Sequence, residues 1–314
     1  MYLEYCTTKL GNFGDDLNPW IFPKLIPNAF KNGNDKIAFL GIGTILDQRR
    51  VERENLHLNQ ANIVFSSGAG FGKPPTLDKK WHIYCVRGSH TAKQLKIDNT
   101  KVIADGAYLL RNIVNFKNIK KKYKVSFIPH HGSEDYTDWA KICEQCGINF
   151  ISMRQSVDNI LQEMLETETI ITEAMHGAIV ADALRVPWIP VSYSPKFMLE
   201  KWQDFAGALS IDLSVDTLPF HVHKKLNLGQ NVENSLKRTF RKLGVGPIKW
   251  DRLPSAYKKS STAQMDQLCE QLLNLSINGK QHQSTDIVVE GVTQRLTETL
   301  DILYTDYISG KFFK

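Results

Sequence analysis

Short apolar runs that end in glycine-bearing turns recur through the first half of the chain, and they constrain its fold more than any other feature. The runs KIAFLGIGT (36–44) and ANIVFSSGAGFG (61–72) end in small residues, and WHIYCVRGSHTAKQL (81–95) passes from a strand into a helix. KVIADGAYLL (101–110) is another strand-and-turn unit. Because buried parallel strands read as continuous apolar runs, this alternation predicts an α/β fold with a parallel sheet.

A second alternation of apolar runs and helical segments begins near residue 124. Its predicted strands and helices follow one another at 124–133, 135–147, 148–153, 156–167, 168–172, 175–185 and 186–193. In the segment 156–167 the apolar residues recur at helical spacing, at Val157, Ile160, Leu161, Met164 and Leu165. Two such series in one chain predict two Rossmann-type βα domains that face each other across a cleft.

The lysine-rich stretch NFKNIKKKYK (115–124) separates the two series, and we interpret it as an interdomain linker. After about residue 220 no further strand is expected, and three segments look helical, at 231–243, 260–277 and 286–308. The predicted parts are an N-terminal domain at 1–115, a linker at 116–124, a C-terminal domain at 125–250 and a helical tail at 251–314. In a two-lobed chain of this kind, a terminal helix that returns to the N-terminal domain is natural.

The composition describes a soluble globular chain. It has 314 residues, of which 42% are hydrophobic and 23% are charged, and this length suits two domains of ordinary size. No stretch approaches the ~20 uninterrupted apolar residues of a membrane span, and the N-terminus lacks a basic and apolar leader, so we expect a cytoplasmic protein. A net charge of +6 suits a phosphorylated substrate, an anionic membrane face or nucleic acid, and selects none of them.

The cysteines carry little functional signal. The chain has five, which are scattered and odd in number, and this argues against a disulfide framework and fits a reducing cytosol. Cys143 and Cys146 form a lone CxxC, without the second pair or nearby histidines that zinc would need and without a thioredoxin-like setting. We therefore interpret both as structural, and we expect no metal site.

Glycine-rich turns follow two of the predicted strands, GIG ending at Gly43 and GAGFG around Gly70. Neither matches G-x-G-x-x-G, and no acidic residue about twenty positions after Gly68 could hold a ribose, so a nicotinamide or flavin site is disfavoured. The glycines either permit tight turns or expose backbone N–H groups that cradle an anion or a sugar.

Two adjacent carboxylates lie in GNFGDDLNPWIF (11–22), just before an apolar helical pattern. Asp15 or Asp16 could cap that helix or favour its N-terminus. Alternatively, one of them accepts a hydrogen bond from a hydroxyl of an acceptor substrate, or deprotonates it, with Asn12 beside them in the same site.

Three cations follow predicted strands in both domains. Arg87 comes after WHIYCV, Arg154 after INFISM, and Lys196 just beyond WIPVSYS. Each could be an ordinary surface residue. Together they indicate a site for phosphate or carboxylate groups.

His176 falls in the first turn of the helix expected at 175–185, beside Gly177 and after the strand ETIIT (168–172). The electropositive end of a helix attracts anions and disfavours an imidazolium, so a histidine there could act as general acid or base against a bound phosphate ester. The alternative is a partly buried packing residue. His130 and its neighbour His131 also follow a strand and could line the cleft, but the pair is weak evidence for a metal.

Over residues 10 to 200 these motifs, in order and spacing, resemble the polysaccharide pyruvyl transferase family. The matching segments are GNFGDDLN, FLGIGT, VFSSGAGFG, VRGSHTAKQL, IADGAYLL, ISMRQSVDNIL and ITEAMHGAIVADALRVPWIPVSYSPKF, and the opening segment most resembles the ketal-forming, succinoglycan-type branch. The resemblance implies a GT-B-like fold and transfer of the pyruvyl group of phosphoenolpyruvate to two hydroxyls of a sugar, with release of phosphate.

Carried over by motif, the family's histidine falls on His176, its arginine on Arg87, its acidic residue on Asp15 or Asp16 and its late lysine on Lys196. The chain departs from the family at Ala174, where members often have an arginine. Arg154 is the candidate to replace it. The resemblance implies no cofactor beyond the donor phosphoenolpyruvate and a sugar acceptor that is an oligosaccharide or a lipid-linked glycan.

Two other functions remain open from the sequence. A GT-B glycosyltransferase would use a nucleotide-sugar and need a carboxylate in the second lobe to grip the ribose, for which Glu173 is the candidate. A non-catalytic relative would only bind glycans. Nucleic acid is disfavoured because the basic residues are not interleaved with aromatics into a recognisable module. The pairs Lys237-Arg238, Arg241-Lys242 and Lys258-Lys259 either belong to a solvated helix surface, which is the more common case, or help the protein bind peripherally at the inner face of the membrane.

Overall fold

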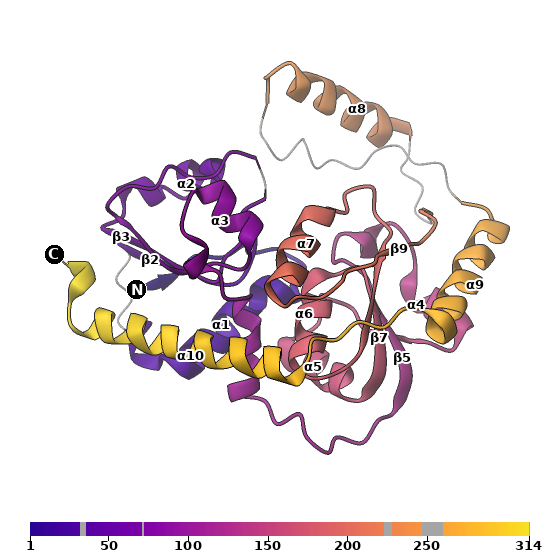
Figure 1. Ribbon diagram of the computed structural model, residues 1–314. Coiled ribbons are helices and arrows are strands. Elements are labelled where there is room, and N and C mark those ends of the chain that lie inside the picture. The colour runs from indigo at the N-terminus through magenta and orange to yellow at the C-terminus, as the bar shows by residue number, and fades with distance from the viewer. Residues whose placement is uncertain (32–35, 71, 223–227, 247–259, 314) are drawn as a thin grey trace.

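The structure, a computed structural model, describes residues 1–31, 36–70, 72–222, 228–246 and 260–313 (Figure 1). The first sheet consists of four parallel strands in the order β1 (Tyr2–Leu3), β2 (Ile37–Leu40), β3 (Ala61–Phe65) and β4 (Trp81–Cys85). The helices of this first lobe are α1 (Phe13–Leu25), α2 (Gln48–Arg53) and α3 (Ser89–Leu95). Strands β2 and β3 are buried throughout, which is why they read as continuous apolar runs.

The second sheet has five parallel strands, in the order β6 (Asn149–Phe150), β5 (Tyr123–Ile128), β7 (Thr167–Thr172), β8 (Trp188–Ser192) and β9 (Asp216–Thr217). The helices of this second lobe are α4 (Trp139–Cys146), α5 (Val157–Leu165), α6 (Met175–Ala183) and α7 (Leu199–Ala208). All five apolar residues that predicted the amphipathic helix in 156–167 are buried on α5, so that prediction is confirmed.

Three long helices follow the second sheet: α8 (Leu228–Lys242), α9 (Thr262–Asn278) and α10 (Asp286–Ile308). They confirm the three helical segments expected after about residue 220. Helix α9 packs on α4 of the second lobe, whereas α10 runs along the first lobe and packs on the 3₁₀ segment η4 (Gly106–Asn112) and on β4. The chain therefore ends on the lobe in which it began (Figure 1).

One large hydrophobic cluster joins the two lobes. A single cluster of buried side chains includes Phe39 and Phe65 from the first sheet and Ile128 and Ile170 from the second. Shorter 3₁₀ turns complete the chain, at η1 (Pro27–Ala29), η2 (Leu56–Leu58), η3 (Asn99–Lys101), η5 (Ser133–Asp135) and η7 (Lys311–Phe313). The α/β architecture with parallel sheets is as expected, and within the described ranges no helix is long and apolar enough to cross a bilayer.

Two expectations were wrong. The segment 101–110 forms no strand beyond an isolated bridge between Val102 and Val86, because the Asp105 side chain accepts a hydrogen bond from Ala107 N at 3.0 Å and starts the turn of η4. The cysteines are not all free, since Cys146 forms a disulfide with Cys269 that joins α4 to α9. Cys143 is buried in the apolar core of the second lobe, which is a structural position.

Candidate functional site

His176 lies in the first turn of α6, directly after the carboxyl end of β7. The turn between them is closed by Thr172, whose hydroxyl accepts a hydrogen bond from Ala174 N at 3.0 Å. Gly177 allows the helix to approach the strand, because an added Cβ there would lie 2.5 Å from Thr172 Oγ1. Gly177 therefore has a packing role that sets the position of the neighbouring histidine, whose side chain is only 13% exposed.

Asp105 faces the imidazole from the first lobe. His176 Nε2 lies 3.6 Å from Asp105 Oδ2, and the Asp105 side chain is fully buried. Burial alone would raise the pKa of Asp105, but His176 and the charge of Arg87 outweigh it and hold that pKa below its usual value. Asp105 is thus an ionised carboxylate aimed at one ring nitrogen, an arrangement that orients an imidazole.

The first turn of α1 lies against the other edge of the same ring. An added Cβ on Gly14 would lie 1.9 Å from His176 Nδ1. This turn is anchored to the second lobe by Phe13 N, which donates a hydrogen bond to Met153 O at 3.0 Å. His176 is therefore held between Gly14 and Asp105, both of which belong to the first lobe.

Asp15 adds a second buried carboxyl to this region, with only 7% of its surface exposed. Burial raises the pKa of Asp15 to about 6, although the nearby His176 and a hydrogen bond from the Asn12 side chain both act to lower it. Gly43 backs this carboxyl, because an added Cβ there would lie 3.1 Å from Asp15 Oδ1. Asp15 can thus gain or lose a proton near neutral pH, as a general acid or base must.

Asp16 has a different role. Its carboxylate accepts a hydrogen bond from Asn12 N at 3.0 Å, at the N-terminal end of α1. The sequence left two roles open for these adjacent aspartates, and each residue takes one of them. Asp16 stabilises the helix N-terminus, and Asp15 faces the site.

Two lysine side chains, Lys196 and Lys201, form a cationic set near His130, which follows β5. Desolvation, followed by the charges of His131, Lys201, His176 and Lys196, lowers the pKa of His130 to about 3, although its side chain reaches solvent. The His130 and His131 rings are 4.3 Å apart between centroids. Such a concentration of positive charge suits an anion.

Lys201 connects this cationic set to the glycine turn of the first lobe. An added Cβ on Gly70 would lie 3.8 Å from Lys201 Cγ, so the lysine stem runs along the Gly70 backbone. The site therefore draws on β3 of the first lobe as well as on β5 and α7 of the second.

Arg87 is not in an exposed position. It is completely buried, its guanidinium pairs with Asp204 of α7 at 3.2 Å, and its Nη1 donates to Thr44 Oγ1 at 3.0 Å. Gly68 leaves room for it, because an added Cβ would lie 2.3 Å from Arg87 Cζ. Arg87 therefore joins the lobes. Its charge affects the site indirectly, by lowering the pKa of Asp105.

Arg154 and Glu173 hold loops at the edge of the site. Arg154 Nη2 donates to His131 O at 2.6 Å and pairs with Asp135 at 3.0 Å. Glu173 is buried, and its two carboxylate oxygens accept hydrogen bonds from His130 N at 3.0 Å and Ser194 N at 2.8 Å. Both residues fix the backbone on which the cationic set is mounted.

Comparison with known protein families gives independent information on this site. Residues 63–195 match the family described as polysaccharide pyruvyl transferase. This part of the chain is therefore similar to polysaccharide pyruvyl transferases. The chain is also 35% identical over 209 residues to the succinoglycan biosynthesis protein ExoV of Rhizobium meliloti (strain 1021), which covers 66% of this chain and 64% of that relative. The chain thus spans a little under two thirds of the relative's length, and no solved structure matches it.

The residues that match the pyruvyl transferase family include most of the site. Arg87, Asp105, Arg154 and His176 lie within 63–195, whereas Asp15 lies before that range. Sequence reasoning missed three residues that the fold brings in, namely Asp105, Lys201 and Asp204. Asp105 was detectable as an acidic residue ending the apolar run KVIAD, but the other two lie on α7, for which no helix was expected.

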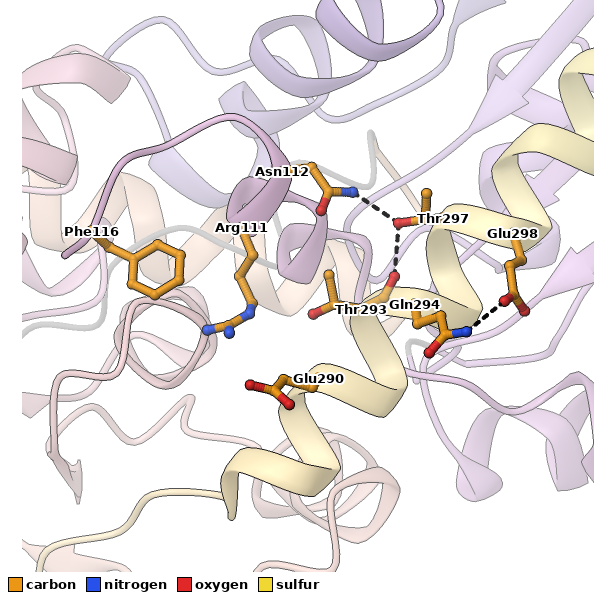
Figure 2. A pocket seen from close by; sticks show the side chains of 8 residues that line it. All are labelled: Arg111, Asn112, Phe116, Glu290, Thr293, Gln294, Thr297 and Glu298. Carbon is orange, nitrogen blue, oxygen red and sulfur yellow. Dashed lines mark hydrogen bonds between the residues drawn. The ribbon is translucent and has the colours of Figure 1, made fainter.

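A surface pocket of about 350 Å³ lies elsewhere, between the end of η4 and α10 (Figure 2). Figure 2 shows the Arg111 guanidinium between the Phe116 ring and the Glu290 carboxylate. The residues that line it are Arg111, Asn112, Phe116, Glu290, Thr293, Gln294, Thr297 and Glu298. It shares no residue with the set around His176, and its links to α10 and, through Arg111, to Ala183 O of α6 indicate a structural junction.

Proposed function

We propose that this protein transfers the pyruvyl group of phosphoenolpyruvate to two hydroxyls of a sugar, in a polysaccharide or its lipid-linked precursor, and releases phosphate. The observation that carries the proposal is the placement of His176 between Gly14 and the buried Asp105 carboxylate, close to the buried carboxyl of Asp15. The match of residues 63–195 to the polysaccharide pyruvyl transferase family supports the same reaction class. The scheme uses phosphoenolpyruvate as substrate and calls for neither a cofactor nor a metal.

The donor carries a phosphate and a carboxylate, which need fixed positive charge. We assign this role to the cationic set near His130, that is, to Lys196 and Lys201. Arg154, the residue expected to replace the arginine absent at Ala174, already binds His131 O and Asp135. We therefore expect Lys201→Ala to raise the KM for phosphoenolpyruvate about ten-fold or more, and Arg154→Ala to have its main effect on stability.

In the first half of the reaction, a proton from His176 is added to the methylene carbon of phosphoenolpyruvate, and the electrons of the C=C bond form the new C–H bond. The central carbon becomes positively charged, and the oxygen of one sugar hydroxyl bonds to it while its proton passes to a base. Asp105 acts as a positioning residue, since its carboxylate faces Nε2 and orients the imidazole that donates the proton.

In the second half, the bond between the central carbon and the phosphate oxygen breaks, and phosphate leaves with the bonding electrons. The second sugar hydroxyl bonds to the same carbon and closes the cyclic ketal. Asp15, with its pKa of about 6, is the group we assign to accept a hydroxyl proton. One proton ends on the new methyl group, and the other is released with phosphate or to water.

The glycosyltransferase alternative loses its best candidate residue. It requires a carboxylate in the second lobe that grips a ribose, but both Glu173 oxygens accept backbone hydrogen bonds inside the protein. Calorimetric binding of a nucleoside diphosphate would revive this alternative.

The test is incubation with phosphoenolpyruvate and a panel of oligosaccharide and lipid-linked acceptors, followed by mass spectrometry for the ketal and a phosphate assay. Wild-type protein should add one pyruvyl group and release one phosphate. His176→Ala should lose at least 100-fold in rate while retaining glycan binding, and the exposed His57→Ala should match wild type. No product across the panel would refute the proposal, and glycan binding that survives without turnover would indicate a non-catalytic relative.

A further inference from the structure

Helix α8 exposes a continuous apolar stripe. Val232, Leu236, Phe240 and Leu243 are 58%, 53%, 49% and 72% exposed. They lie four, four and three residues apart, a spacing that places them on one face of a helix. Large apolar side chains that are exposed together on one face, rather than scattered singly, indicate a surface that binds another protein or a membrane.

Four basic residues accompany the stripe on α8, namely Lys237, Arg238, Arg241 and Lys242. Lys237 and Lys242 flank the apolar stripe by helical periodicity, and Arg238 and Arg241 lie on the opposite side. The single acidic residue described on the helix, Glu233, pairs with Lys237. A helix with an apolar stripe between long basic side chains is the type that lies flat in the interface of a bilayer, where the stems reach along the acyl boundary and the charges meet headgroups.

The position of α8 leaves that face accessible. The helix stands apart from both lobes in Figure 1. The chain leaves and rejoins the second lobe at one point, where Ser260 N donates to Val222 O at 2.9 Å and Val222 N donates to Ser260 Oγ at 3.0 Å. These two hydrogen bonds join the chain before and after α8, so the second lobe is held together at this junction without a contribution from α8.

We propose that α8 is a membrane-docking helix, which places its apolar stripe in the surface of an anionic bilayer. The stripe could be covered by lipid or by the same stripe of a second copy of the chain, and the charge around it favours lipid. Two copies would bring the lysines that flank each stripe, Lys237 and Lys242, close to the same lysines of the second copy, whereas anionic headgroups complement them. This inference concerns a surface remote from His176, and it stands or falls independently of the pyruvyl transfer reaction.

Flotation of the full chain with vesicles tests the inference. Wild-type protein should float with vesicles of phosphatidylcholine and phosphatidylglycerol in a two-to-one ratio, bind phosphatidylcholine alone far more weakly, and be released by high salt. Leu236→Glu/Phe240→Glu should reduce the partition coefficient at least ten-fold. Lys237→Glu/Lys242→Glu should reduce it at least as much on the anionic vesicles, since each basic side chain near the surface contributes about five-fold.

The matched control is Ile287→Glu/Ile302→Glu, which makes the same change at two exposed isoleucines of α10. It should float like wild type. The inference is overturned if wild-type protein does not float, if the α8 variants float like wild type, or if the control loses binding equally. A concentration-dependent dimer in light scattering that Leu236→Glu/Phe240→Glu abolishes, without vesicle binding, would assign the stripe to a second copy.

Discussion

Gly14→Ala tests the central feature of the site, the contact between α1 and the His176 ring. The Cβ of alanine would lie 1.9, 2.5 and 2.8 Å from ring atoms Nδ1, Cγ and Cε1. These distances are far below van der Waals contact, so the ring must move by more than an ångström or α1 must shift. On its other side the ring faces Asp105 at 3.6 Å, so any movement alters that contact.

The effect on stability has two opposing parts. Alanine in a helix is favoured over glycine by about 0.5–1 kcal/mol, whereas overpacking a filled site costs about 1–3 kcal/mol. Gly291 of α10 is the matched control, because an added Cβ there meets no atom within 4 Å. Gly291→Ala should therefore gain about 0.5–1 kcal/mol, and Gly14→Ala should be about 1–3 kcal/mol less stable than Gly291→Ala.

The effect on turnover should be larger than the effect on folding. A misplacement of about 1 Å in a catalytic group costs about 100-fold in rate, so Gly14→Ala should lose about that much phosphate release while remaining folded. Urea unfolding and initial rates measure the two quantities on the same preparations. Wild-type rates and a stability equal to that of Gly291→Ala would show that α1 does not hold the ring, and would refute the geometry described here.

Three further predictions concern buried charges. Asp105→Asn should lower the rate of phosphate release about 100-fold with little change in KM. ¹⁵N NMR of the variant should show a changed tautomer of the His176 ring, and an unchanged ring signal would exclude the positioning role. Because burial raises the pKa of Asp15 to about 6, the contribution of Asp15 to stability falls as pH rises from about 4 through 6. Asp15→Asn should therefore gain about 3 kcal/mol relative to wild type across that window in urea unfolding, and parallel pH profiles of the two proteins would contradict this. Asp204→Asn should cost about 3–5 kcal/mol because it leaves the buried Arg87 guanidinium without its counter-charge, and a thermal melt like that of wild type would contradict the pairing.

Much of the fold was predictable because its determinants are local. Parallel strands buried on both faces leave continuous apolar runs, and α5 shows its helical period in five residues. The expected strand at 101–110 failed because a single side chain, Asp105, starts a 3₁₀ turn that the apolar composition does not reveal. The two-residue strands β1 and β9 are too short to leave a pattern.

The site was less predictable because its partners are distant in sequence. His176 was identifiable from its place between a strand and a helix, and that place is local. Arg87 was expected in the site, but Asp204, which buries and neutralises it, lies 117 residues away on a helix that was not predicted. No local sequence pattern distinguishes a substrate-binding arginine from one that is paired with a carboxylate of the other lobe.

The same distances explain why the lobes must keep their relative orientation for the chemistry. His176 belongs to the second lobe, but Gly14 and Asp105, which bear on its two ring nitrogens, belong to the first. The geometry of the ring is therefore a property of the interface between lobes, which the Arg87–Asp204 pair, the shared hydrophobic cluster and α10 hold in place. Weakening this interface far from the site should thus impair turnover before it unfolds either sheet, because a small rotation between lobes separates Asp105 from His176 while each sheet remains intact.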